Sequence, residues 1–170
     1  MKYKTIILDR DGVINEVRDD YVKSKNELKY IDGSIQAINK LLSIYEVAVA
    51  SNQAGVGKGL ISHVNLSLIS SDINRQLSRN IDFFYCTHQK HEKCRCRKPQ
   101  PGLLEEIMLK KPAPFLFVGD NKTDYWAAKN ANIDFCFVKT GYGENHHLEV
   151  PNDYFLFSDL ESLTNWLVGK

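Results

Sequence analysis

The sequence lacks an excess of charge of either sign. Its 170 residues carry 22 Lys and Arg against 21 Asp and Glu, a formal net charge of +1. A general nucleic-acid-binding protein usually has a strongly basic balance, so this composition argues against nucleic acid as a partner. A long apolar run is also missing, because the residues before Asp9 and Arg10 are too few for a signal peptide or a membrane span. We therefore expect a cytoplasmic protein that binds no membrane.

Cysteine is scarce and unevenly distributed. Of the four cysteines, Cys86, Cys94 and Cys96 fall within eleven residues. In a reducing cytoplasm, such a group is more typical of a metal site or a reactive centre than of a disulfide framework. Cys136 stands apart in the apolar run 135–138. There it is expected to pack as a small hydrophobic residue.

The remaining composition, 43% hydrophobic and 25% charged, is that of a globular protein, and the length fits one domain over 1–170. Apolar runs typical of strands alternate with segments of helical spacing. This alternation predicts right-handed crossovers and an α/β fold with a doubly wound, mostly parallel sheet. We expect strands at 5–8, 46–50, 82–85, 115–118, 135–138 and 154–157, and helices over 35–42, 66–77, 102–110, around 127–128 and at the C-terminal end up to residue 170.

Carboxylates follow the first and fourth predicted strands. Asp9 and Asp11 come after the first, and alternate residues of an extended segment share a face, so both can point the same way. Asp120 follows the fourth strand, with Asp124 four residues later. Mg²⁺, which prefers carboxylate oxygens together with water and substrate phosphate, would remove the repulsion within such a cluster. In a doubly wound sheet these strands can flank the point where strand order reverses, and ligands bind there.

Groups suited to an anion follow the other strands. Ser51, Asn52 and Gln53 supply a hydroxyl and two amides, and Arg97 and Lys98 add positive charge. Phosphoryl transfer requires mainly positioning and charge neutralisation, so these groups suffice for it. Each of them alone fits a solvated strand end or turn. Together, each after an apolar strand, they indicate phosphate chemistry.

Three thiols and one imidazole lie close together in the sequence, contributed by Cys86, His88, Cys94 and Cys96. They form a full tetrahedral set for Zn²⁺, with His91 as an alternative to His88. A closed set of four ligands leaves no position for a substrate, so we expect a structural ion. It would order the loop 86–96, which leads into the basic pair at 97–98.

The motifs together resemble those of the haloacid-dehalogenase superfamily, which appear in order as Asp9-Arg10-Asp11-Gly12, Ser51, Lys98, and Gly119-Asp120 with Asp124. The resemblance implies that Asp9 is the nucleophile, transiently phosphorylated, and that Asp11 is the general acid and base. It implies that Ser51 and Lys98 bind the transferring phosphoryl group. The Mg²⁺ ligands would be Asp9, Asp120 and the main-chain carbonyl of Asp11. Val13 replaces the family's usual Thr, so one supporting hydrogen bond is expected to be missing.

The presence of Asp11 favours a phosphatase over a dehalogenase, because an acid must protonate an alkoxide leaving group and then activate water. A kinase is disfavoured, since the glycine-rich stretch 55–59 lacks the spacing of a P-loop and is predicted to be a flexible turn. Short connections at 12–32 and 55–62 leave no room for a cap domain. A zinc-stabilised binding module without activity is disfavoured by the intact carboxylates, and a phosphatase for nucleic-acid ends by the near-neutral charge.

Within the superfamily, the chain is similar to the branch that dephosphorylates D-glycero-D-manno-heptose 1,7-bisphosphate, with the histidinol-phosphatase domain as close kin. The segments 20–22, 98–102 and 138–143 favour the heptose branch, whereas the five residues between His88 and Cys94 favour the histidinol branch. The resemblance implies a monomeric enzyme that leaves the sugar 1-phosphate. It assigns substrate contacts to residues 51–54, Arg97, Asp19 and Tyr21. Asn121 stands where the heptose branch often has lysine.

Overall fold

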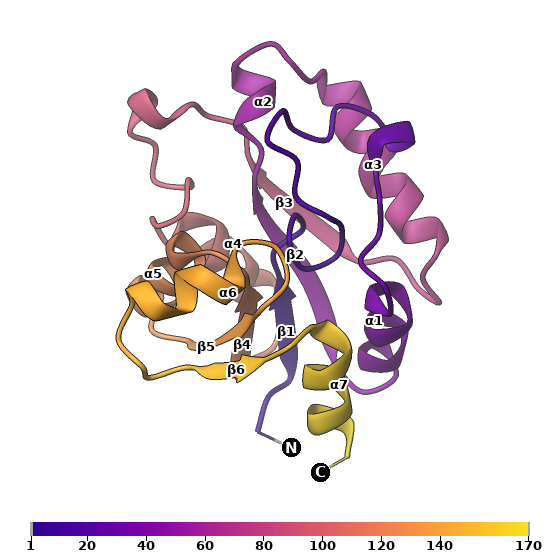
Figure 1. The fold of residues 1–170 in the computed structure, drawn as a ribbon, viewed down its shortest axis with the longest axis vertical. Coiled ribbons are helices and arrows are strands. Elements are labelled where there is room, and N and C mark those ends of the chain that lie inside the picture. The colour runs from indigo at the N-terminus through magenta and orange to yellow at the C-terminus, as the bar shows by residue number, and fades with distance from the viewer. Residues whose placement is uncertain (1, 170) are drawn as a thin grey trace.

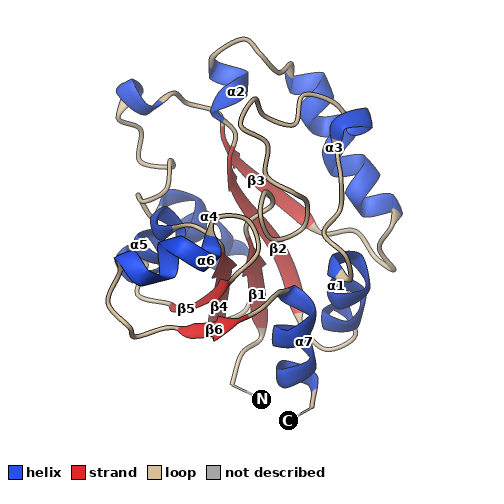
Figure 2. Cartoon of the chain, in the orientation of Figure 1, coloured by secondary structure: helices blue, strands red, loops and turns tan. Residues whose placement is uncertain are grey.

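A single six-stranded sheet forms the centre of the computed structural model, which describes residues 2–169 (Figure 2). Every neighbouring pair of strands is parallel, in the order β3-β2-β1-β4-β5-β6. Strand order therefore reverses at β1, which has β2 on one side and β4 on the other. This confirms the predicted doubly wound sheet. The strands are β1 Thr5–Leu8, β2 Glu46–Asn52, β3 Asp82–Cys86, β4 Phe115–Gly119, β5 Asp134–Val138 and β6 Phe155–Phe157.

Helices cover both faces of the sheet (Figure 1). One core contains residues of α1, α3 and α7, and the other contains residues of α4 and α5. The α-helices are α1 Ser34–Leu42, α2 Ala54–Gly57, α3 His63–Arg75, α4 Gly102–Lys110, α5 Lys122–Asn130, α6 Gly143–His146 and α7 Leu160–Val168. Three short 3-10 turns are η1 Lys25–Glu27, η2 Lys90–Glu92 and η3 His147–Glu149.

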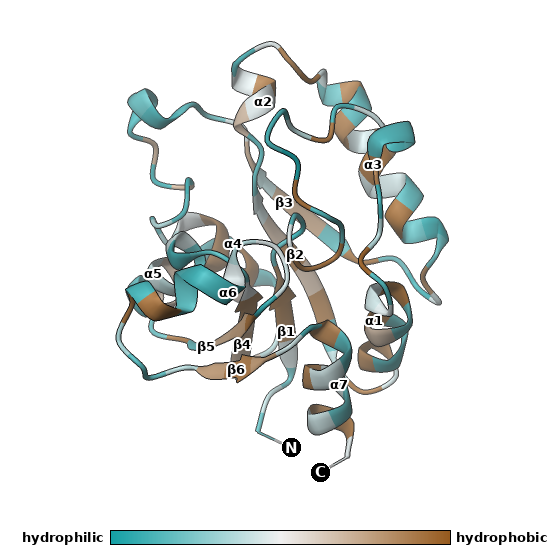
Figure 3. Ribbon diagram, viewed as in Figure 1, coloured by the Kyte–Doolittle hydropathy of each residue, from teal (hydrophilic) through white to brown (hydrophobic). Residues whose placement is uncertain are grey.

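The residues of β1 explain why the sheet is buried on both faces. Ile6 and Leu8 point into the core formed with α1, α3 and α7, whereas Ile7 points into the core formed with α4 and α5. All three are fully buried. A strand covered on both faces reads as a continuous apolar run, which is why this strand could be recognised from the sequence. Figure 3 shows β1 and β4 in hydrophobic colours and the segment around η2 in hydrophilic ones.

One connecting segment and one helix differ from the sequence-based prediction. The stretch 55–59 was predicted to be a flexible turn, but its residues 55–57 belong to the one-turn helix α2. Gly57 is needed there because a Cβ at this position would lie 2.5 Å from the main-chain oxygen of Thr87. Helix α3 ends at Arg75, before Leu77, although Leu77 still packs against the core.

Residues 2–169 form no separate cap domain, as predicted from the short connections. The chain between β1 and α1 contains only the turn η1, and the chain between β2 and α3 contains only α2.

Cys136 is fully buried in a hydrophobic core, which confirms its expected packing role. Among the described residues, no helix combines the length and apolarity that crossing a bilayer requires.

Candidate active site

A cavity of about 860 Å³ opens at the carboxyl ends of β1, β2 and β4. This is the position at which a doubly wound sheet binds ligands, because the strand order reverses there. Parallel strands bring their carboxyl ends to the same edge, so polar residues distant in sequence meet in one cavity. The predicted residues that line it are Asp9, Asp11, Ser51, Asn52, Arg97, Lys98, Asp120, Asn121 and Asp124.

Three buried carboxylates, those of Asp9, Asp120 and Asp124, have oxygens within 4.8 Å of one another. Burial and the nearby charges of Asp124 and Asp9 hold the pKa of Asp120 well above its usual value. Burial also raises the pKa of Asp124 to about 7, with Lys98 opposing the shift and Asp9 adding to it. Such a cluster fits a divalent cation, because an ion with oxygen ligands relieves the same repulsion. The structure thus brings Asp124, which the sequence placed in the same cluster, beside Asp9 and Asp120.

Lys98 is the cation that faces these carboxylates. Its Nζ lies 3.0 Å from Asp9 and 2.6 Å from Asp124, and it donates a hydrogen bond to the carbonyl of Ala50 at 2.9 Å. The side chain is almost fully buried. Burial lowers the pKa of Lys98, but the charges of Asp124 and Asp9 outweigh that effect and raise it. Lys98 is therefore held as a fixed positive charge beside the candidate nucleophile.

Asn52 and Gln53 bind protein groups in this structure, although both were expected to bind phosphate. The Asn52 side chain accepts a hydrogen bond from the Lys98 main-chain N–H at 3.0 Å and donates one to the Lys98 carbonyl at 3.1 Å. Gln53 Nε2 donates to Asp11 at 2.7 Å and to the Ser51 hydroxyl at 3.1 Å. Both amides therefore fix the positions of the groups that face the cavity.

Asp11 is the carboxylate with the most hydrogen-bond donors around it. Besides the hydrogen bond from Gln53, it accepts one from Asn15 Nδ2 at 2.8 Å and forms an ion pair with the Arg10 guanidinium. Burial alone would raise its pKa, but Arg10 and the amides of Asn15 and Gln53 outweigh burial, so the pKa is lowered. The carboxylate still has 28% of its side-chain surface exposed toward the cavity. Without a bound substrate, Asp11 is therefore held in its ionised form.

Two glycines make room for the Asp120 carboxylate. Gly12 and Gly141 have φ angles of 85° and 59°, and a Cβ on either would lie 2.1 Å from Asp120 Oδ2. The main-chain N–H of Tyr142 donates to the same oxygen at 2.8 Å. Sequence reasoning used the segment 138–143 only as a family resemblance and missed its contact with Asp120. The signal available was the Gly-Tyr-Gly turn directly after an apolar strand.

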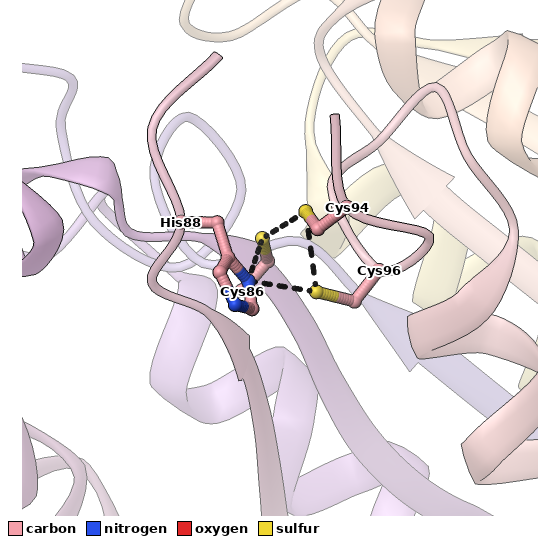
Figure 4. Close-up of side chains that lie close together, drawn as sticks. All are labelled: Cys86, His88, Cys94 and Cys96. Atoms are coloured by element: carbon pink, nitrogen blue, oxygen red, sulfur yellow. Dashed lines mark hydrogen bonds between the residues drawn. The ribbon is translucent and has the colours of Figure 1, made fainter. Parts of the chain in front are cut away.

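The four predicted zinc ligands lie together in the structure (Figure 4). Cys86 Sγ is 3.5 Å from Cys94 Sγ and 3.6 Å from His88 Nδ1. Cys96 Sγ is 3.5 Å from Cys94 Sγ and 3.2 Å from His88 Nδ1. A tetrahedral ion with Zn–S bonds of about 2.3 Å needs ligand separations of roughly 3.5–3.8 Å. Three of the four separations match this range and the contact of Cys96 with His88 is shorter, so the group fits the ion closely. The group contains His88 and not His91, which lies in η2.

If the group of four ligands holds zinc, loss of the ion should loosen the loop 86–96 before the rest of the protein unfolds, since metal binding is coupled to the ordering of its ligands. We expect Cys94→Ser to lose zinc and to lower the unfolding midpoint by at least about 5 °C. Metal content by mass spectrometry and thermal unfolding check this. Cys136→Ala, a core change away from the group of four, is the control and should keep the full zinc content. Protein purified without chelators and free of zinc would contradict the site.

The remaining predicted substrate contacts lie in different surroundings. Arg97 lines the cavity, and its guanidinium donates to the His88 carbonyl at 3.4 Å. Asp19 is exposed, and the Tyr21 hydroxyl accepts a hydrogen bond from Lys58 at 2.9 Å. Within residues 2–169, neither Asp19 nor Tyr21 lines the cavity. Asn121 caps α5 by accepting a hydrogen bond from the Thr123 N–H at 3.1 Å.

Comparison with known proteins adds independent evidence. A family model described as HAD-hydrolase-like matches residues 95–163. D-glycero-beta-D-manno-heptose-1,7-bisphosphate 7-phosphatase of Neisseria meningitidis is 34% identical, and the match covers 98% of this chain and 96% of that protein. The Pseudomonas putida protein of the same name is 36% identical over 97% of this chain and 99% of its own length.

Solved structures of heptose-bisphosphate phosphatases also resemble this chain. The crystal structure of D,D-heptose 1,7-bisphosphate phosphatase from B. bronchiseptica, complexed with magnesium and phosphate, has a TM-score of 0.92 and 34% identity, with 98% of each chain covered. The corresponding structure from Burkholderia thailandensis has a TM-score of 0.75 and 28% identity, covering 98% of this chain and 99% of that one.

Proposed function

Because the chain belongs to the heptose-bisphosphate phosphatase family of haloacid-dehalogenase-like hydrolases, we propose that it hydrolyses D-glycero-D-manno-heptose 1,7-bisphosphate to the 1-phosphate. The observation that carries the proposal is the pairing of Asp9 with Lys98 at 3.0 Å, in a cavity that Asp11 also lines. A nucleophile, a fixed cation and a second carboxylate are the groups that a two-step phosphate-ester hydrolysis needs.

In the proposed reaction, a carboxylate oxygen of Asp9 attacks phosphorus and the bond from phosphorus to the sugar oxygen breaks. Asp11, protonated when the anionic phosphate of the substrate binds beside it, gives that proton to the leaving sugar oxygen. Water then attacks the phospho-aspartyl group, gives a proton to Asp11, and releases phosphate while Asp9 is regenerated. Ser51 and Lys98 hold the transferring group. Mg²⁺, when bound by Asp9, Asp120 and the main-chain carbonyl of Asp11, would neutralise phosphoryl charge, with Asp124 beside it.

The cytoplasm is the proposed location, and a single-domain monomer the proposed form. Four free cysteines, three of them in a zinc-type group, support a reducing compartment. The products would then enter carbohydrate metabolism in the same compartment, consistent with heptose biosynthesis. Relatives of this chain are named for either anomer, as in the alpha-anomer enzyme of Photorhabdus laumondii, so the proposal extends to the heptose and not to its anomer.

Histidinol phosphate is the second candidate substrate. It is favoured by the short connection of five residues between His88 and Cys94. Histidinol phosphate carries one phosphate and an amine, whereas the rim of this cavity carries several cations, among them Lys90, Lys93 and Arg97. The second phosphate of the bisphosphate suits this positively charged rim better than the amine of histidinol phosphate does, which supports the bisphosphate.

The proposed role of Arg97 separates substrate recognition from chemistry. Its planar guanidinium can contact a second phosphate or nearby hydroxyls with a fork that lysine cannot reproduce. We expect Arg97→Ala to lower kcat/KM for the bisphosphate by about 10- to 100-fold, since a hydrogen bond to a charged group contributes roughly 1.5–3 kcal/mol. For p-nitrophenyl phosphate, the change should stay within about threefold. Steady-state kinetics on both substrates measure the ratio.

Arg95→Ala is the matched control: Arg95 also lines the cavity, but its largely exposed guanidinium is already paired with Glu105 at 2.9 Å. It removes a nearby positive charge without removing Arg97, and both substrates should respond alike. A general loss of folded protein cancels in the ratio. Equal losses on the two substrates for Arg97→Ala would mean that this loop does not recognise the sugar bisphosphate.

A further inference from the structure

Arg10 separates the two catalytic candidates in the sequence and, among residues 2–169, is the largest of the side chains that are almost completely buried. It follows Asp9 directly and precedes Asp11, but its guanidinium does not reach solvent, since only 1% of its side-chain surface is exposed. Removing a charged group from water is costly unless it is paired. The reason for its burial should therefore lie in the partner that it holds.

That partner is Asp11. Arg10 Nη2 donates to both carboxylate oxygens of Asp11, at 2.8 Å and 2.9 Å, and Nε lies 3.3 Å from Oδ1. The amides of Asn15 and Gln53 each add one hydrogen bond to the same carboxylate. The two oxygens are thus contacted by three side chains, of which Arg10 alone carries charge and alone contacts both oxygens.

The Tyr85 hydroxyl of β3 also acts on Arg10. Burial lowers the pKa of Arg10, but the Asp11 carboxylate and, after it, Tyr85 outweigh burial and raise it. Tyr85 shares a hydrogen bond of 2.9 Å with Ser70 of α3. Among residues 2–169, no residue of β3 or α3 lines the cavity.

We propose that Arg10 is a positioning residue, which holds the Asp11 carboxylate in the orientation that exchanges a proton with the ester oxygen of the substrate. This inference rests on the proposed phosphatase function. An ion pair on the buried side of Asp11 restricts rotation of the carboxylate and leaves its exposed edge facing the cavity. Arg10 itself is not expected to touch the substrate, because its guanidinium is buried behind Asp11.

The proposal predicts a dependence on the leaving group. An ester of an acidic phenol, such as p-nitrophenyl phosphate, needs little protonation as it departs, whereas an alkyl ester such as a sugar phosphate needs a proton from Asp11. We expect Arg10→Met to lower kcat for the sugar phosphate by about 100-fold, at the lower end of the effect of a general acid. For p-nitrophenyl phosphate, the loss should be no more than about fivefold, with KM little changed.

A series of phenyl phosphates with leaving groups of increasing pKa tests this directly. The loss in Arg10→Met should grow steadily along the series. In an Asp11→Asn background, the same change should cost nothing further, because the carboxylate that it positions no longer exchanges a proton. Tyr85→Phe is the control for general damage: it keeps the ion pair between Arg10 and Asp11, so any loss that it causes should be equal on all leaving groups.

Arg10→Lys provides a second variant where Arg10→Met does not fold, because it retains the charge and loses the planar fork. It should show the same dependence with a smaller slope. Equal losses on all leaving groups, or full additivity with Asp11→Asn, would overturn the positioning role. Wild-type protein without any phosphatase activity would instead contradict the proposed function, so the two failures can be told apart.

Discussion

Replacing Asp9 with asparagine should abolish turnover of every phosphate ester, with a loss of at least about 10⁴-fold, the order expected when a covalent nucleophile is removed. An amide oxygen is a far weaker nucleophile than a carboxylate and cannot accept the phosphoryl group to form the proposed intermediate. The substitution keeps the size and shape of a residue that is only 8% exposed. Phosphate release from the sugar bisphosphate and from p-nitrophenyl phosphate measures the loss.

Folding and trapping experiments complete the Asp9 test. The Asp9→Asn protein should unfold cooperatively and retain its zinc, because the group of four ligands does not include Asp9. A metallofluoride that mimics the transferring phosphoryl group should bind the wild type with Mg²⁺ and fail to bind this variant. Substantial turnover by a correctly folded Asp9→Asn protein would rule out the covalent mechanism.

Replacing Lys98 with methionine should lower kcat/KM on both the bisphosphate and p-nitrophenyl phosphate by about 10²–10³-fold, the cost typical of removing one preorganised group that stabilises developing charge. The Lys98 ammonium lies 3.0 Å from Asp9, the proposed nucleophile, and 2.6 Å from Asp124. Methionine retains much of the buried side chain and removes only the charge. Arg97→Ala, which should affect the bisphosphate alone, is the comparison.

The same variant should show a stability effect that depends on metal. Removing one partner of a buried ion pair costs about 3–5 kcal/mol, because it leaves buried carboxylates without a counter-charge. In a chelator, Lys98→Met should therefore unfold at a lower temperature than the wild type, and Mg²⁺ should restore more stability to the variant than to the wild type. Full activity of Lys98→Met on p-nitrophenyl phosphate would contradict the role of Lys98 in holding the transferred group.

The sheet and the main site residues could be predicted because local pattern and fold coincide there. β1 and β4 are buried on both faces, so they read as unbroken apolar runs, and each is followed by an aspartate. Parallel pairing of these strands then brings Asp9 and Asp120 to one edge of the sheet. The four zinc-type ligands were equally visible, because three cysteines and a histidine so close in sequence have few other uses in a reducing compartment.

Other parts of the site depend on tertiary contacts that no local pattern specifies. The Asn52 amide looked free for phosphate, but the loop that returns 46 residues later brings the main chain of Lys98 against it. Arg10 received no role from the sequence, and only the structure shows that it is buried and paired with Asp11. The contact of Gly141 with Asp120 likewise joins segments from two different strand ends.

The most direct test of the proposed function is a comparison of kcat/KM for D-glycero-D-manno-heptose 1,7-bisphosphate and for histidinol phosphate, with Mg²⁺ present. Phosphorus NMR of the sugar product identifies which phosphate remains. The bisphosphate should be the better substrate by at least about 100-fold, since its second phosphate has charged contacts available at the basic rim of the cavity. The product should be the 1-phosphate. Faster turnover of histidinol phosphate, or release of the phosphate at C1, would contradict the proposed function.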